Sequence, residues 1–262
     1  MIAYFKNLYK NRELLQRLCY REISVKYKQS FLGFAWAVLR PVIYMLIFMA
    51  IKGSGAVSVD SGTAPYALFT YAALLPWTLF VSSVTSASSS VVANSGILQK
   101  IYFPREIFPT AAVLAPLLDF FIAAVVYVGL MIYYGIYPSS QIILLPALLC
   151  IQMLLALGLG ILLSGLAVFR RDFVYATGYI LQFMLFLTPV MYSIQKIPQK
   201  YMNLYLWLNP MAGIIESYRY ILIYKQFPPS NYYLWPLGLS AVLFVISFKI
   251  FKKMEGAFAD VV

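Results

Sequence analysis

The sequence predicts an all-α integral membrane protein: an N-terminal amphipathic interfacial helix, six transmembrane helices, and short re-entrant gate helices between spans five and six. Two observations support this fold class. Hydrophobic residues make up 62% of the 262 residues and charged residues 11%, with a mean hydropathy of +0.80, whereas soluble domains are about 45–50% apolar and about 25% charged. Segments without any charge, such as 120–169, are also longer than the roughly 20 residues that one helical crossing of a bilayer needs.

Residues 1–33 form the predicted interfacial helix, and residues 34–262 form the predicted six-helix permease domain. Apolar residues alternate with basic ones at near-helical spacing in the first segment, which is typical of a helix at a membrane surface. Its basic residues are Lys6, Lys10, Arg12, Arg17, Arg21, Lys26 and Lys28. The segment lacks the apolar run and small-residue cleavage site of a secretory signal, so we expect it to be retained.

Six hydrophobic runs predict the spans. They cover about 34–51, 65–92, 107–134, 142–169, 173–195 and 232–250. Pro76, Pro116, Pro146 and Pro189 fall inside these runs, where we expect kinks because neighbouring helices can satisfy the freed carbonyls. The turn residues 137–140 separate spans three and four.

Three connections between spans carry further structure. The connection 94–106 is too short for a domain and too apolar for a free loop, so we expect a helix of one to two turns that either docks on a partner or lies on lipid headgroups. The shorter connection 169–173 is either a second contact or a basic anchor. The connection 196–231 is semi-apolar, and Asn209–Pro210 fits a helix start, which predicts short helices dipping toward the membrane.

The distribution of lysine and arginine predicts the orientation. With a cytoplasmic N-terminus, 15 of the 20 Lys and Arg residues fall on the cytoplasmic side or at the cytoplasmic end of a span. Membrane proteins concentrate these residues on that side. Both termini are therefore expected in the cytoplasm.

Several kinds of chemistry are disfavoured. No lysine is followed by Ser or Thr, so the chain has no phosphate-binding loop of the ATPase type and we expect its energy to come from another protein. It has no histidine and two cysteines, Cys19 and Cys150, which argues against a zinc site or a disulfide framework. The net charge of +11 is spread between the spans, which does not favour nucleic acid as a partner.

The acidic residues do not form an enzyme-like pair along the sequence. Membrane enzymes on lipid-linked precursors generally need paired carboxylates. The candidates outside the spans, Glu13, Glu22, Glu106, Asp172 and Glu216, are scattered over both sides without close pairing. Within the spans Asp119 is the single acid, which disfavours proton coupling. Asp119 is either a packing residue held by Ser, Tyr or a partner helix, or a residue with a part in substrate passage.

A series of short motifs, in order and spacing, resembles the transmembrane subunit of polysaccharide and polyol-phosphate ABC exporters, the group with the O-antigen and teichoic acid export permeases. The similarity covers nearly the whole chain. The motifs are Val25–Trp36 leading into Leu39–Pro41, Leu75–Trp77, Lys100–Pro104, Phe169–Asp172, Thr188–Tyr192, and Asn209–Met211 with Glu216–Arg219.

This resemblance implies partners and a substrate. Two copies of the chain would pair as a homodimer with two copies of a separate nucleotide-binding ABC subunit. That subunit would bind ATP and Mg, leaving this chain without a cofactor. The location would be the bacterial cytoplasmic (inner) membrane, and the cargo an undecaprenyl-diphosphate-linked polysaccharide of O-antigen type. Alternatives are a permease for teichoic acid, another surface polymer or a drug, and more distantly an enzyme that acts on a lipid-linked precursor.

The resemblance also suggests site residues. Contacts that couple the chain to the ATPase would involve Gly96, Ile97, Leu98, Lys100, Ile101, Tyr102, Phe103, Pro104, Arg105, Arg171 and Asp172. Charge and position suggest Arg21, Lys26, Lys28 and Arg40 for the substrate diphosphate. Aromatic residues expected to line the pore are Trp36, Tyr44, Tyr71, Trp77, Phe183, Phe186 and Tyr192. Gate residues would be Asn209, Pro210, Glu216 and Arg219, of which the last two, three apart on a helix, favour a local ion pair over a substrate site.

Overall fold

The computed structural model describes residues 2–28, 30–55, 64–98 and 104–258, and these residues form helices and loops without a strand. The longer elements are α1 (Ile2–Lys10), α2 (Arg12–Tyr27), α3 (Ala35–Gly53), α4 (Tyr66–Ala93), α7 (Leu117–Tyr133), α8 (Leu145–Phe169), α9 (Asp172–Leu187) and α12 (Ser230–Glu255). The shorter ones are α5 (Ser95–Leu98), α6 (Ile107–Leu114), η1 (Ser140–Leu144), η2 (Ile194–Lys196), α10 (Gln199–Leu208), α11 (Pro210–Arg219) and η3 (Tyr220–Tyr224). The all-α prediction is confirmed.

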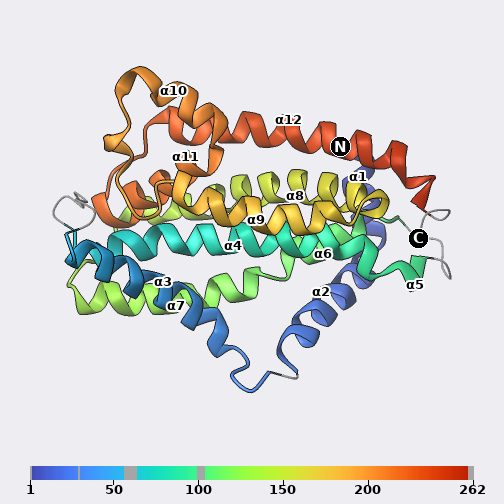
Figure 1. Cartoon of the computed structure of the whole chain (residues 1–262), viewed down its shortest axis with the longest axis horizontal. Helices are drawn as coiled ribbons and strands as arrows, with labels where there is room; N and C mark the ends of the chain where they lie inside the picture. Colours follow the sequence, from blue (N-terminus) through green and yellow to red (C-terminus); the bar gives the residue numbers. More distant parts are fainter. Residues whose placement is uncertain (1, 29, 56–63, 99–103, 259–262) are drawn as a thin grey trace.

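Within the described ranges, five segments are long and apolar enough to cross a membrane. They are α3, α4, α6 with α7, η1 with α8, and α12. A sixth apolar helix, α9, has 16 residues and is shorter than the predicted span 173–195. The long helices lie roughly alongside one another (Figure 1).

The predicted end of span five is wrong, because α9 stops at Leu187. Thr188 has an extended backbone (φ −92°, ψ 143°), as expected for a residue that precedes a proline. Pro189 therefore ends this helix instead of kinking it.

Pro116 divides the third predicted span into α6 and α7. A proline lacks the N–H that would continue the helical ladder, and its ring displaces the preceding turn. The Ser83 hydroxyl on α4 donates a hydrogen bond of 3.0 Å to the Val113 carbonyl near this break. A neighbouring helix thus supplies a donor where the ladder is interrupted, as membrane helices require.

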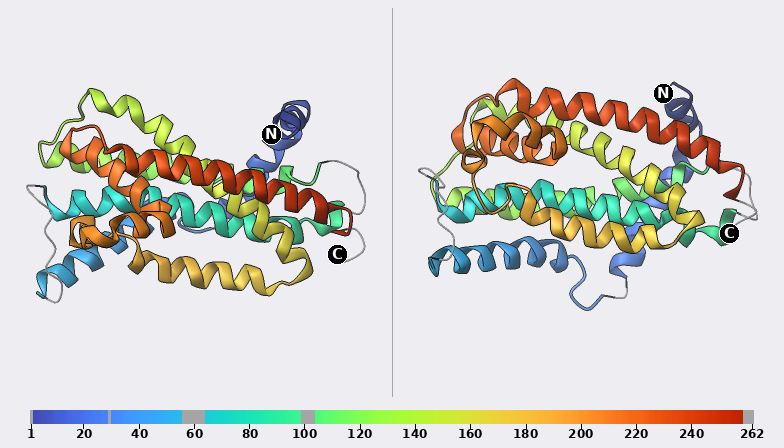
Figure 2. Two further views of the ribbon diagram at one scale, coloured as in Figure 1. Left: turned by 90° about the horizontal axis from the view of Figure 1, so that it is seen from above. Right: turned by 45° about the horizontal axis from the view of Figure 1, so that its top comes forward.

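Helix α4 lies at the centre of the bundle and contacts α3, α6, α7, α8, α9 and α11. Figure 2 shows its surroundings from two further directions. The end of α12 and the helix α1 lie at one end of the bundle, and α10 and α11 lie at the other. Below, these are called the α1 end and the α10 end.

Small residues allow α8 to approach its neighbours closely, which is typical of helix packing in membranes. A Cβ atom added to Gly160 would lie 2.6 Å from the Ala87 Cβ on α4, and one added to Gly158 would lie 3.1 Å from the Phe244 backbone nitrogen on α12. The buried Gln152 side chain donates a 2.8 Å hydrogen bond to the Pro76 carbonyl, which also joins α8 to α4.

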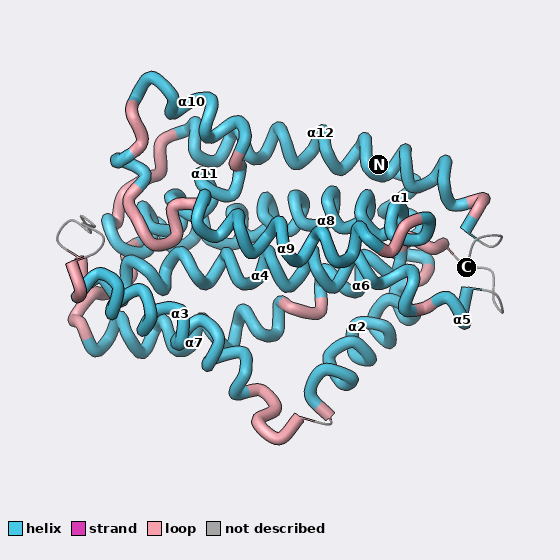
Figure 3. Tube along the Cα trace, in the orientation of Figure 1, coloured by secondary structure: helices cyan, strands magenta, loops and turns pink. Residues whose placement is uncertain are grey.

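The N-terminal segment forms two helices, α1 and α2, which meet at Asn11, where the sequence predicted one interfacial helix. The amphipathic pattern is present, but the apolar side contacts protein: Tyr4 and Leu18 are buried in a cluster with residues of α6, α8 and α12. Basic residues such as Lys10 and Arg17 are exposed. The loop after α2 then turns into α3 (Figure 3).

Replacing Gly160 with leucine tests the α4–α8 contact. We expect Gly160→Leu to lower the free energy of unfolding by about 1–3 kcal/mol, because the added side chain overlaps Ala87. The matched control is Gly129→Leu on α7, where an added Cβ meets no atom within 4 Å. Thermal denaturation in detergent measures both, and equal midpoints would contradict the packing argument.

Candidate functional site

A stripe of hydroxyl groups runs along the side of α4 that other helices leave uncovered. Between residues 67 and 91, every side chain of α4 is buried except six. These six are Thr78, Val81, Ser82, Thr85, Ser86 and Ser89. Their spacing places them on one helical face. Five hydroxyls on the one open face of a membrane helix point to contact with something polar.

Thr78, Ser82 and Thr85 of the hydroxyl stripe form the floor of a groove of about 370 Å³, here called the α3–α4–α9 groove. Arg40 and Tyr44 of α3 line one wall, and Leu181 and Gln182 of α9 line the other. A groove between packed membrane helices is ordinarily lined by apolar side chains. Because this groove has a polar floor and Gln182 in one wall, it is a candidate path for a hydrophilic molecule.

A second cavity, of about 420 Å³, lies between the last turn of α2, α4 and the break between α6 and α7. We call it the basic cavity. Its polar lining includes Glu22, Lys26, Tyr27, Arg40 and Asp119. Arg40, Val81, Ser82 and Thr85 line both this cavity and the α3–α4–α9 groove. The two spaces therefore adjoin at these four side chains.

Lys26 and Tyr27 both reach across from α2 to Asp119, which sits in the first turn of α7. The Lys26 ammonium forms an ion pair with one carboxylate oxygen of Asp119, and the Tyr27 hydroxyl donates a hydrogen bond to the other. Partial burial, and then the hydrogen bond and charge of Asp119, raise the pKa of Tyr27. The hydroxyl therefore stays protonated at neutral pH and keeps its role as a donor.

Arg40 differs from these paired groups. Its side chain is exposed, and no hydrogen bond or ion pair joins it to any residue in the described ranges. An unpaired guanidinium next to a cavity, on a helix that crosses the membrane, is costly unless it meets water or an anion. Arg40 is therefore the cation of this site that is free to bind a ligand.

The other two cations predicted for a diphosphate lie elsewhere. Arg21 donates to Glu22 at 3.0 Å and to the side chain of Asn94 at the end of α4. Lys28 is exposed beyond the end of α2 and does not line the basic cavity. Of the four predicted residues, the structure brings together Lys26 and Arg40.

Two of the predicted pore aromatics, Tyr44 and Trp77, line the α3–α4–α9 groove. A third, Trp36, lies beside Lys26, Arg40 and Asp119. Phe183 and Phe186 are 68% and 57% exposed on α9, where Tyr175 and Tyr179 are also exposed. The spacing of these four rings places them on one side of α9.

The other two predicted aromatics have structural contacts. Tyr71 is fully buried, stacks on Tyr127 and donates a 3.3 Å hydrogen bond to the Ala123 carbonyl, so it does not line the groove. The prediction for Tyr71 was wrong because helical spacing does not tell which face of a helix a neighbouring helix covers. The Tyr192 hydroxyl donates to the Leu187 carbonyl at 2.9 Å and lies in the turn after α9.

At the α10 end, Arg219 and Glu216 form the predicted local ion pair, at 3.1 Å. Arg219 is fully buried and also donates to the carbonyls of Phe69, Val190 and Tyr192, with its guanidinium 3.6 Å from the Phe69 ring centre. It therefore ties α11 to α4 and to the turn that follows α9.

Asn209 and Pro210 begin α11 as predicted, but the Asn209 side chain does not cap the helix. Its amide nitrogen donates a 2.9 Å hydrogen bond to the Thr188 hydroxyl. The two residues thus join α11 to the end of α9, alongside the contacts of Arg219.

The predicted coupling segment is described in part. Lys100, Ile101, Tyr102 and Phe103 lie outside the described residues. Gly96, Ile97 and Leu98 belong to the single turn α5, consistent with the short helix expected there. Arg171 and Asp172 begin α9 at the same, α1 end and are exposed.

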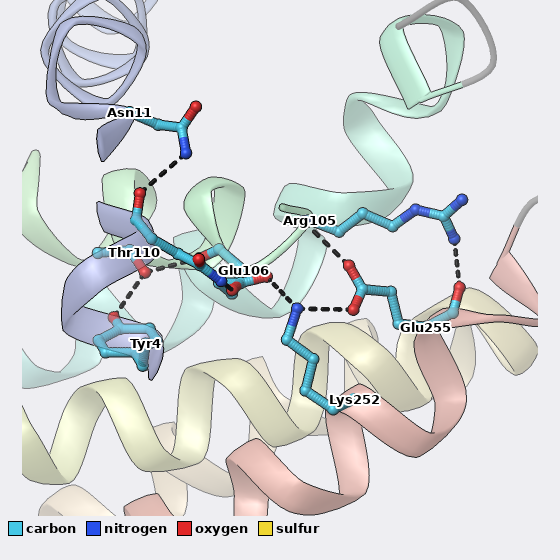
Figure 4. Close-up of polar contacts among 8 residues, drawn as sticks. Tyr4, Asn11, Arg105, Glu106, Thr110, Lys252 and Glu255 are labelled. Atoms are coloured by element: carbon cyan, nitrogen blue, oxygen red, sulfur yellow. Dashed lines mark hydrogen bonds and ion pairs between the residues drawn. The ribbon is translucent and has the colours of Figure 1, made fainter. Parts of the chain in front are cut away.

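Directly after the coupling segment, the buried Glu106 joins three parts of the chain (Figure 4). Its carboxylate accepts hydrogen bonds from Asn7 of α1 at 3.2 Å and from Lys252 of α12 at 2.7 Å. Arg105 next to it contacts Glu255 through both its backbone nitrogen and its guanidinium. We call this group the Glu106 cluster.

Sequence reasoning missed the hydroxyl stripe and the role of Glu106. The stripe was detectable from the spacing of Thr78, Ser82, Thr85 and Ser89 in an apolar span, since these positions share a helical face. No local pattern marks Glu106, because its partners lie 99 and 146 residues away.

Substituting Arg219 tests its structural role. We expect Arg219→Met to lower the free energy of unfolding by about 3–5 kcal/mol, because Glu216 would remain charged and buried without a partner. The double variant Glu216→Gln/Arg219→Met should lose less, since it leaves no unpaired charge. The control is Arg21→Gln, whose partly exposed pair with Glu22 should contribute about 1 kcal/mol or less. Thermal denaturation in detergent measures the stability of each variant. If Arg219→Met is as stable as Arg21→Gln, the structural role of Arg219 is contradicted.

Comparison with known proteins identifies the family. Residues 13–223 match the ABC-2 type transporter family. The chain is 30% identical to an O-antigen export system permease protein, RfbA, of Myxococcus xanthus, over 99% of both chains. It is 30% identical to RfbA of Klebsiella pneumoniae, over 95% of both, and 26% identical to the polysialic acid transport protein KpsM of Escherichia coli, over 78% of this chain and 79% of that one. With its membrane-crossing helices and the family match over most of its length, the chain belongs to the ABC-2 type transporter family of membrane permeases.

Proposed function

We propose that the chain is the channel-forming subunit of an ATP-driven ABC exporter. The exporter moves an undecaprenyl-diphosphate-linked polysaccharide, of O-antigen type, across the bacterial inner membrane. The observation that carries the proposal is the junction at Arg40 and Ser82 between a basic cavity and a hydroxyl-lined groove. The relatives named as O-antigen export permeases over 95% or more of the chain support the same class of substrate.

The chemistry of the two spaces matches the two parts of such a substrate. A diphosphate needs cations, and Arg40 offers a guanidinium that pairs well with phosphate oxygens. Sugars offer hydroxyl groups to side chains such as Ser82, Thr85 and Gln182, and present apolar faces to rings such as Tyr44 and Trp77. Each contact is weak, so a polymer can slide along the groove.

A second copy of the chain would complete the channel. The groove is open between α3 and α9, and beside it α9 presents the exposed rings of Tyr175, Tyr179, Phe183 and Phe186. A homodimer facing across this opening would enclose the polar floor and cover these rings.

Energy would come from two copies of a separate nucleotide-binding ABC subunit, which would hold ATP and Mg so that this chain needs no cofactor. In this proposal the α1 end, with both termini, faces the cytoplasm. That places α5 and the start of α9, with Arg171 and Asp172, where the ATPase would dock, and α10 and α11, with Asn209, Pro210, Glu216 and Arg219, at the extracytoplasmic gate. Movement of α5 would reach α1 and α12 through the Glu106 cluster.

Affinity purification of the tagged chain from its native host tests the partner and the cargo class. We expect an ATPase to co-purify and the deletion strain to lose a surface polysaccharide. The double variant Ile101→Asp/Tyr102→Asp should remain in the membrane but lose the ATPase, because charge replaces the apolar docking surface. If the chain purifies without an ATPase and the deletion strain keeps its surface polymers, the exporter proposal is wrong. An enzyme that acts on lipid-linked precursors would then be the favoured function.

Arg40 tests the cationic site. We expect Arg40→Gln to lower export roughly tenfold, equivalent to the loss of one hydrogen bond to a charged group, while assembly with the ATPase persists. Arg40→Lys should recover part of the loss because it keeps the charge. The control is Lys249→Gln on α12, an exposed cation that lines neither space. Pulse-labelled appearance of polymer at the cell surface measures export, and normal export by Arg40→Gln would refute the assignment.

A further inference from the structure

We propose that Asp119 is an internal competitor for the substrate's anionic group. With no substrate bound, its carboxylate holds Lys26 and Tyr27 of α2; a lipid-anchored diphosphate takes these two donors and releases α2 from α7. The inference rests on the proposed function and gives Asp119 a role in regulating substrate binding.

The contacts at Asp119 support this exchange. Both carboxylate oxygens are engaged by α2, one by the Lys26 ammonium and one by the Tyr27 hydroxyl. These two residues are the end of α2, directly before the loop into α3. The contact therefore fastens the last turn of α2 over the break between α6 and α7, beside the basic cavity.

A diphosphate can substitute for the carboxylate because both are anionic oxygen acceptors. The phosphate groups offer more charge and more acceptor oxygens, and Arg40 lines the same cavity as a further, unpaired cation. The other charged group facing the cavity is Glu22 of α2, which is paired with Arg21. A diphosphate bound here would thus meet two cations, whereas Asp119 now contacts one.

Asp119 can also tolerate the loss of its contacts with Lys26 and Tyr27. Its side chain is 18% exposed and that of Lys26 is 41% exposed, so water and ligand can reach the pair. In addition, Asp119 lies in the first turn of α7, at the end of the helix dipole that favours a negative charge. The carboxylate therefore does not become a buried, unpaired charge when Lys26 leaves.

The exchange would link substrate binding to the position of α2. The same helix contacts α6 and is bonded through Arg21 to Asn94, at the start of the coupling segment. Loss of the Asp119 contact would free the end of α2 nearest the cavity while leaving its other end on the bundle. The diphosphate would then open its own path toward Arg40 and the α3–α4–α9 groove.

Binding measurements on the permease–ATPase complex in lipid nanodiscs test the exchange. The probe is undecaprenyl diphosphate, with undecaprenol as the uncharged comparison. We expect Asp119→Asn to bind the diphosphate about two- to fivefold more tightly than the wild type, the equivalent of one partly exposed ion pair. Tyr27→Phe removes a donor from the carboxylate and from the diphosphate alike, so it should change affinity by less than Asp119→Asn does. Glu13→Gln, at an exposed carboxylate outside the cavity, is the matched control and should leave affinity unchanged.

The dependence on Lys26 separates competition from a merely structural role. Lys26→Gln should weaken diphosphate binding, and adding Asp119→Asn to it should restore less affinity than Asp119→Asn adds to the wild type, because Tyr27 is then the single donor for which Asp119 competes. Undecaprenol binding should be the same in all variants. If Asp119→Asn binds the diphosphate no more tightly than the wild type, or if it adds as much affinity to Lys26→Gln as to the wild type, the competition is wrong.

The outcomes also separate this inference from the proposed function. A wild type that prefers the diphosphate and loses affinity in Lys26→Gln, but gains none in Asp119→Asn, would overturn the competition and keep the cationic site. A wild type that binds undecaprenol as well as undecaprenyl diphosphate would overturn the cationic site, and the competition with it.

Discussion

The close packing of α4 against α8 is the constraint on which the rest of the structure depends. At Gly160 and Ala87 the two helices approach to a distance that leaves no room for a larger side chain. Because α8 in turn packs on α12 at Gly158, three crossing helices form one rigid unit. Between residues 67 and 91, the remaining helices leave only Val81 and the stripe of hydroxyls on α4 uncovered. The polar groove is thus a consequence of how thoroughly the rest of α4 is covered.

The charged residues divide by what they contact. Arg219 with Glu216 and Lys252 with Glu106 are pairs in which at least one member is fully buried. Lys252 and Glu106 join segments far apart in the sequence, and Arg219 does so through the carbonyls of Phe69, Val190 and Tyr192. In a low-dielectric surrounding, separating such a pair is costly, so these groups fix the architecture. Arg40 is exposed and has no such partner in the described ranges, and Lys26 has one that water can reach. The charges available to an anion are therefore those that the fold does not need.

Helix α2 connects the two ends of the proposed mechanism. Through α1 and Asn7 it is continuous with the Glu106 cluster beside the coupling segment, and through Lys26 and Tyr27 it reaches Asp119 beside the basic cavity. Leu18 in the middle of α2 is buried against the bundle, whereas Lys26 at the end of α2 is held by a contact that water can reach. The end of α2 beside the basic cavity can therefore change position at a lower cost than its middle. Movement driven by an ATPase and displacement driven by a substrate would thus act on the same helix.

The sequence by itself determined the membrane class, the helical runs, the absence of a phosphate-binding loop, the Glu216–Arg219 pair and, through ordered motifs, the transporter family. These follow from composition and from residues within a few turns of one another. Tertiary structure decided which cations share a cavity, that Tyr71 is buried while Ser82 is open, and that Glu106 joins α1 to α12. Asp119 had two open interpretations in the sequence, because its partners lie more than 90 residues away. Helical periodicity gives the faces of a helix, but only the packing of distant helices decides which face is covered and which charge is left without a partner.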